Sequence, residues 1–125
     1  MIPNNIVRTA YKQALKAEHR FRIGAIIFRN NYIAGRGYNK PHKTHPKSNH
    51  PFHTIHAEFD AIIDFLVRHT KGTIGAYNLY VHRISRNNDS PALSRPCVHC
   101  VEMLRGYGLK EVFYSTSNGI RRMNL

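Results

Sequence analysis

Apolar residues gather in short runs that are typical of strands, and polar turn residues separate these runs. Strands are predicted over the four segments 22–28, 32–39, 77–84 and 111–116, which are rich in apolar, β-branched and aromatic side chains. The turn residues Arg29, Asn30 and Asn31 join the first two segments, which should therefore form a hairpin. The final residues, 120–125, follow another turn signal and are expected to pair back as a short antiparallel strand.

Other apolar residues recur at helical spacing and predict three helices. Asn4 and Asn5 can cap the first helix. The second begins near residue 54, and the third runs over about 97–105, ahead of two glycines. A polar loop with three prolines, 40–53, precedes the second helix and is long enough to suggest a function.

The order of these elements predicts the fold class. Strands that alternate with helices indicate an α/β protein with helices on both faces of one sheet. We expect a three-layer α/β/α sandwich around a mixed sheet of four or five strands. The chain has 125 residues, the usual size of one domain, so residues 1–125 are expected to form a single domain.

Composition narrows the setting of the protein. Two cysteines are too few for a disulfide framework, which suggests a reducing compartment. The chain shows neither an apolar signal core at its start nor a stretch long enough to span a membrane, so a cytoplasmic protein that does not contact membranes is expected. Nineteen Lys and Arg against seven Asp and Glu give a net charge of +12, which favours nucleic acid, phosphorylated small molecules or acidic surfaces. The cations are scattered, so the charge also fits a merely solvated surface.

The two cysteines, Cys97 and Cys100, lie three residues apart at the start of the third predicted helix. This spacing is nearly one helical turn, so both sulfurs point the same way, and the helix N-terminus favours thiolates. The pair can be a redox couple, part of a zinc site, or two buried thiols.

The second predicted helix begins with the triplet HAE, which favours the zinc interpretation. His56 can supply a nitrogen ligand, whereas Glu58 lies on a different face and can stand beside a metal-bound water. Two sulfurs and one nitrogen make three protein ligands, and a catalytic zinc keeps its fourth position for water. A redox pair would leave the triplet unexplained.

These residues resemble the joint motif of the zinc-dependent cytidine and deoxycytidylate deaminases, H-x-E followed by P-C-x-x-C. Here the motif reads His56-Ala57-Glu58 and Pro96-Cys97-Val98-His99-Cys100, and the likeness extends over about 22–116. The resemblance implies a cytidine deaminase-like fold and a zinc ion bound by the histidine and both cysteines. It also implies that Glu58 is the catalytic proton carrier.

The resemblance also suggests residues that contact the substrate. Asn39 matches a family asparagine at the sugar, and the backbone N–H groups of Ala57 and Cys97 are placed to bind developing charge or a carbonyl. Phe52 or His53 is expected to line the base pocket. A phosphate contact is expected from at least one of the loop cations, a set that includes Lys40 and Arg95.

Two departures from the family pattern leave the substrate open. Asp60 stands where deoxycytidylate deaminases often have asparagine. The expected antiparallel last strand resembles the free-cytidine branch, yet that branch has cysteine in place of His56.

The favoured function is a zinc-dependent hydrolase that converts cytosine to uracil in a cytidine or deoxycytidine nucleotide and releases ammonia. Its partner would be a small pyrimidine nucleotide or nucleoside, and the resemblance suggests a homo-oligomer. The net charge supports an alternative, a polynucleotide cytidine or adenosine deaminase acting on RNA or single-stranded DNA. A second alternative is a non-enzymatic zinc-binding module, although such a module would not need Glu58. A purine deaminase also stays open.

Overall fold

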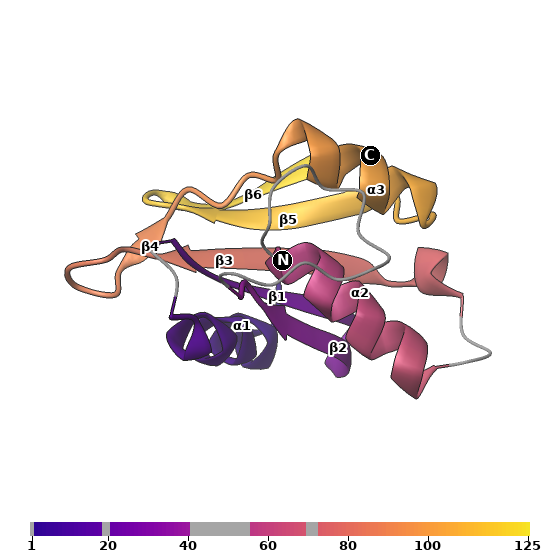
Figure 1. Ribbon diagram of the computed structural model, residues 1–125, viewed down its shortest axis with the longest axis horizontal. Coiled ribbons are helices and arrows are strands. Elements are labelled where there is room, and N and C mark those ends of the chain that lie inside the picture. Colours follow the sequence, from indigo (N-terminus) through magenta and orange to yellow (C-terminus); the bar gives the residue numbers. More distant parts are fainter. Residues whose placement is uncertain (1, 19–20, 41–55, 70–72) are drawn as a thin grey trace.

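In the described residues, a six-stranded mixed sheet forms the centre of the fold. Figure 1 shows its strands side by side, with helices packed against them. The structure is a computed structural model that describes residues 2–18, 21–40, 56–69 and 73–125. The strands are β1 (Arg22–Arg29), β2 (Tyr32–Tyr38), β3 (Asn78–Ile84), β4 (Pro91–Ala92), β5 (Glu111–Thr116) and β6 (Gly119–Asn124). Five of them follow the order β2-β1-β3-β5-β6, and β4 pairs with the end of β3.

The sheet confirms the predicted mixed α/β architecture, with one strand more than expected. The pairs β1–β2, β1–β3 and β5–β6 are antiparallel, whereas β3 and β5 run parallel. The additional strand, β4, has only two residues and begins with Pro91. A strand of two residues is too short to show an alternating pattern, and proline is more typical of loops. The sequence therefore predicts a loop here.

In the described part of the chain, three α-helices accompany the sheet: α1 (Asn4–Lys16), α2 (Ala57–Arg68) and α3 (Val98–Gly106). A short 3₁₀ turn, η1 (Ile74–Ala76), precedes β3. The expected cap of the first helix is wrong, because Pro3 occupies the N-cap and no side chain caps the helix. The amide of Asn5 instead donates a hydrogen bond to the carbonyl of Asn31, 3.0 Å away, which ties α1 to the β1–β2 turn.

The helices cover both faces of the sheet, which confirms the three layers. On one face, Ile6 and Ala10 of α1 pack with Ile26 and Phe28 of β1 and with Tyr80 of β3. The opposite core joins residues of α2, α3 and the central strands, among them Ala25, Ile27, Ala61, Phe65, Leu79, Val81 and Leu104. Among the described residues, no helix is long and apolar enough to cross a bilayer.

The topology brings the starts of α2 and α3 to one end of the sheet. Because β1 is antiparallel to both β2 and β3, these two strands point in the same direction and end at the same edge. The next α-helix after β2 is α2, and the next after β3 is α3. Gly37 lets α2 lie directly on β2, since a Cβ there would sit 2.3 Å from the backbone nitrogen of Ala61.

Candidate metal centre and substrate cavity

Three side chains with metal-binding atoms meet where α2 and α3 begin. His56 is the N-cap of α2, Cys97 is the N-cap of α3, and Cys100 lies in the first turn of α3. Their ligand atoms all lie within 4.8 Å of one another, and the Cys100 Sγ is 3.3 Å from the His56 Nδ1. Tetrahedral zinc separates such sulfur and nitrogen ligands by about 3.6–3.8 Å. The donor set and its spacing therefore fit zinc.

The electrostatics of the cluster also call for a cation. Burial raises the pKa of Cys100, and the neighbouring Glu58 carboxylate and Cys97 raise it further. Cysteine ligates metals as the thiolate, so a bound cation would supply the compensation that these buried groups lack. The partial positive charge at the two helix N-termini acts in the same direction.

Glu58 lies beside the cluster but outside the set of metal ligands. Its side chain is only 4 % exposed, and burial raises its pKa, whereas hydrogen bonds with its own backbone and with Cys100 lower it. A carboxyl group with a raised pKa exchanges protons more readily near neutral pH than an exposed one. The arrangement suits a group that moves protons rather than one that binds the metal.

A cavity of about 270 Å³ opens next to this cluster. Its wall includes His56, Cys97 and Glu58, together with Asn39, Ala57 and Arg95, three residues that the sequence suggests as substrate contacts. The rest of its described lining consists of Phe21, Ile23, Arg83, Leu93 and Ser94. Two of the three metal ligands, the buried carboxyl group and these three residues thus share one concave space, while Cys100 lies behind its wall.

Asn39 is held tightly at the edge of this cavity. Its Oδ1 accepts a hydrogen bond of 2.9 Å from the Ile23 backbone nitrogen, and its Nδ2 donates to the Phe21 carbonyl. The side chain is 7 % exposed. Asn39 therefore orders the start of β1, which supplies part of the cavity wall.

Lys40 lies elsewhere: it is not among the residues that line the cavity. Its ammonium pairs with the Asp60 carboxylate and lies 4.0 Å from the centre of the Tyr38 ring. Asp60 also accepts a hydrogen bond of 3.1 Å from the Tyr38 backbone nitrogen, so it fastens α2 to the end of β2. The two other suggested pocket residues, Phe52 and His53, fall outside the described residues.

Arg83 is a charged cavity residue that the sequence pattern did not reveal as a site residue, and Phe21, Ile23 and Leu93 were not predicted there either. It is one of three polar positions in its strand, with Asn78 and His82, but it shares its strand face with Leu79 and Val81, which are core residues beneath α2. A cation on the inward face at the end of a strand is a usable signal, because charged residues are rarely placed there without a partner. Ser94, by contrast, is structural, since its buried hydroxyl donates to the Val81 carbonyl at 2.8 Å.

Comparisons with known proteins agree with this geometry. The family model described as the cytidine and deoxycytidylate deaminase zinc-binding region matches residues 3–116. No curated protein matches the chain.

Solved structures show the same fold at low sequence identity. The chain is similar to the apo dCMP deaminase of cyanophage S-TIM5, with 23% identity, a TM-score of 0.61, and coverage of 87% of this chain and 78% of that one. The same cyanophage enzyme in complex with dCMP and dUMP shows 21% identity and a TM-score of 0.57, and the match covers 91% of this chain and 83% of that one. A cytidine deaminase from Burkholderia pseudomallei gives 19% identity, a TM-score of 0.69, and coverage of 99% and 93%.

Proposed function

Because the chain belongs to the cytidine and deoxycytidylate deaminase family, we propose that it is a zinc-dependent hydrolase that converts cytosine to uracil in a cytidine or deoxycytidine nucleotide. The observation that carries this proposal is the convergence of His56, Cys97 and Cys100 beside a buried Glu58, with a cavity that reaches both. Three protein ligands and a nearby carboxyl group are what a hydrolytic zinc site needs.

The residues divide the chemistry between them. Zinc, when bound by His56, Cys97 and Cys100, would lower the pKa of a water molecule to about 7 and supply a nucleophile at neutral pH. Glu58 would take up one proton of the attacking water and pass it to N3 of cytosine. It would then take up the second proton, from the hydroxyl group formed on C4, and pass it to the exocyclic amine, which leaves as ammonia while the ring becomes uracil.

Backbone groups at the two helix starts complete the site. Ala57, fully buried at the start of α2, and Cys97, the N-cap of α3, both line the cavity. Their N–H groups are placed to bind negative charge or a carbonyl oxygen of the base. Asn39 would present its remaining amide hydrogen to the sugar.

A single nucleotide suits this cavity better than a polymer. The volume of about 270 Å³ lies just below the range of about 300–1,000 Å³ for small-molecule pockets. The cyanophage enzyme of the same fold was solved with dCMP and dUMP. The net charge of +12 supports the alternative function, deamination of RNA or single-stranded DNA. The single domain over 1–125, the cytoplasmic location and the homo-oligomer stay predictions.

The test pairs a substrate panel with metal analysis of the purified protein. Ammonia release is measured from dCMP, CMP, deoxycytidine, cytidine and a cytosine-containing single-stranded oligonucleotide, and zinc is counted per chain. We expect one zinc per chain and turnover of a free nucleotide. If the protein binds zinc but deaminates none of these substrates, the proposal is wrong.

A Glu58→Gln variant separates the proton carrier from the metal site. Because the amide cannot accept the proton, we expect kcat to fall by roughly 10²- to 10⁴-fold. Zinc content should not change, since Glu58 lies outside the ligand set. Full activity in this variant would remove Glu58 from the reaction.

A further inference from the structure

We propose that Arg83, assisted by Arg95, binds the 5′-phosphate of the substrate, so that the chain acts on nucleoside monophosphates in preference to nucleosides. This inference rests on the proposed deamination and names the substrate class for the same cavity. It concerns a residue that the joint motif does not include.

The position of Arg83 in the sheet directs it into the cavity. It pairs in register with Ile23 of β1 on one side and with Ala92 of β4 on the other. Alternation along β3 places it on the same face as Val81, which is the face covered by α2 and α3. Ile23 and Arg83 both line the cavity, and Asn39 bonds the Ile23 backbone next to them.

The guanidinium of Arg83 is held in place yet not fully used. It lies 4.7 Å from the centre of the Phe21 ring, and its Nη1 donates a hydrogen bond of 3.3 Å to the Leu93 carbonyl. Among the described residues, its Nε is buried and has no acceptor. A guanidinium carries five N–H donors in a planar fork that matches phosphate oxygens. The ring and the carbonyl hold the guanidinium in place. Because the Nε is buried, the donors left for an anion among the described contacts include the N–H groups of Nη2.

The charges around the cavity favour an anion as well. Its described lining contains two arginines, Arg83 and Arg95, and a single carboxyl group, Glu58. The nearby Arg22 and Lys40 are each paired with an aspartate, Asp89 and Asp60 respectively. Neither lining arginine has a carboxylate partner among the described residues. A terminal phosphate monoester carries close to two negative charges near neutral pH, so it matches two arginines better than a neutral sugar hydroxyl does.

The arginines also stand on the correct side for a 5′-phosphate. The metal ligands and Glu58 lie on α2 and α3, whereas Arg83 and Asn39 lie at the adjoining strand ends. A nucleotide with its base at Glu58 and its sugar at Asn39 would extend its phosphate toward this strand edge. Arg95, exposed and one residue before the helix-start segment Pro96–Cys97, closes the rim.

The experiment compares kcat/KM for dCMP and deoxycytidine in the wild type, Arg83→Met and Arg83→Lys. Arg86→Met is the matched control, because Arg86 is an exposed arginine on the turn after β3 that does not line the cavity. We expect the wild type to prefer dCMP and Arg83→Met to reduce the dCMP-to-deoxycytidine ratio roughly 10- to 150-fold, the range of a charge-assisted hydrogen bond. Arg83→Lys should recover part of the ratio, and Arg86→Met should leave it unchanged.

Calorimetric binding of dUMP and deoxyuridine to the same proteins gives a readout that needs no turnover. Selective loss of dUMP binding in Arg83→Met supports the inference even if the proposed deamination fails. If Arg83→Met lowers kcat/KM for dCMP and deoxycytidine equally, so that their ratio stays constant, Arg83 has a structural role and the inference is wrong. A wild type that prefers deoxycytidine or the oligonucleotide also overturns it, while deamination itself stands.

Discussion

The end of β3 presents two neighbouring residues to opposite faces of the sheet, and their surroundings differ. His82 faces α1, is 4 % exposed, packs edge-on against Tyr11, and shares a 2.7 Å hydrogen bond with the Tyr80 hydroxyl through its Nδ1. Arg83 faces the cavity between the starts of α2 and α3. Among the described residues, each has one buried nitrogen without an acceptor or donor, His82 Nε2 and Arg83 Nε.

The difference shows why an unpartnered buried nitrogen is not by itself a sign of function. Burial lowers the pKa of His82, so this ring stays neutral and behaves as part of the core. Arginine cannot lose its charge under ordinary conditions, so Arg83 keeps a cation at the cavity wall. One face of the strand end therefore serves stability, whereas the role that we propose for the other face is binding.

The largest expected effect is loss of the metal from the cavity face. In Cys100→Ser, one of three ligands is replaced by a poor one, and we expect zinc affinity to fall by about 100-fold or more, because even outer-shell partners account for 10- to 100-fold. Deamination should be lost in parallel. The measurement is zinc retained against a competing chelator.

Val98→Ser is the control for this variant. Val98 lies between the ligands in sequence, but its side chain is 65 % exposed, so zinc affinity should not change. Equal zinc affinity in Cys100→Ser and the wild type would contradict the metal centre and, with it, the division between the two faces.

Sequence patterns predicted the cavity face better at its metal end than at its substrate end. The metal ligands His56, Cys97 and Cys100 lie at two helix starts, and histidine and cysteine are typical metal-binding residues. Their joint motif is therefore visible in the sequence. The position of Arg83 depends on strand register and on Phe21, which comes from a different segment. Such contacts between distant segments leave no local pattern beyond the inward-facing cation itself.

Pairing between elements explains two further differences from expectation. Lys40 belongs to the set of loop cations of which at least one is expected at a phosphate, but its ammonium pairs with Asp60, the fourth residue of α2. Asn5 has the residue type of a cap, but it lies within α1 and its amide bonds the β1–β2 turn. Strand positions were easier to predict because hydrophobic runs between turn residues are a local property.

The α1 face should give a smaller effect, on stability rather than activity. Because burial lowers the pKa of His82, the unfolded chain takes up this proton at a higher pH than the folded one. The contribution of the neutral His82 ring to the free energy of unfolding is thus fully present above the ordinary histidine pKa of about 6.5. It is lost as the pH falls below this value, by up to about 1.4 kcal/mol per pH unit. Urea unfolding between pH 8 and pH 5 measures this slope.

His82→Gln isolates the contribution of this one side chain. Glutamine does not titrate, so the variant should lose less stability than the wild type between pH 8 and pH 5, whatever its stability at pH 8. Its kcat/KM for dCMP should change little, because His82 does not line the cavity. Identical pH slopes in the two proteins would show that His82 does not titrate on unfolding, and a large loss of activity would link the two faces.

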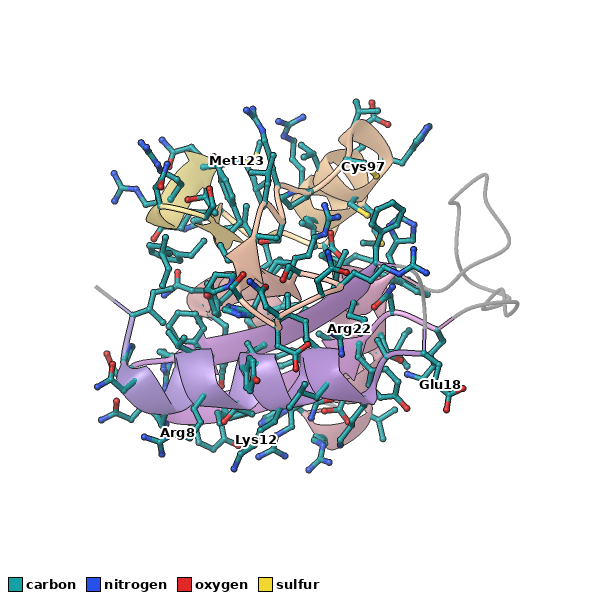
Figure 2. All side chains as sticks on the ribbon, turned by 90° about the vertical axis from the view of Figure 1, so that its left-hand side faces the viewer. Arg8, Lys12, Glu18, Arg22, Cys97 and Met123 are labelled. Atoms are coloured by element: carbon teal, nitrogen blue, oxygen red, sulfur yellow. The ribbon has the colours of Figure 1, made fainter. Side chains whose placement is uncertain are left out.

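The smallest effect is expected on the outer side of α1, where Figure 2 shows Arg8 and Lys12 far from Cys97. Arg8, Lys12 and Lys16 are exposed and follow one another at intervals of four residues, so Lys12→Ala removes two like-charge contacts. We expect the variant to be more stable by a few tenths of a kcal/mol and to turn over dCMP as the wild type does.

The polynucleotide alternative predicts a different result for Lys12→Ala: weaker binding of a single-stranded oligonucleotide, with the slope of log K against log salt concentration reduced by about 0.7 per lost phosphate contact. Fluorescence anisotropy at several salt concentrations distinguishes the two outcomes, and a marked loss of oligonucleotide binding would make the α1 face a functional surface.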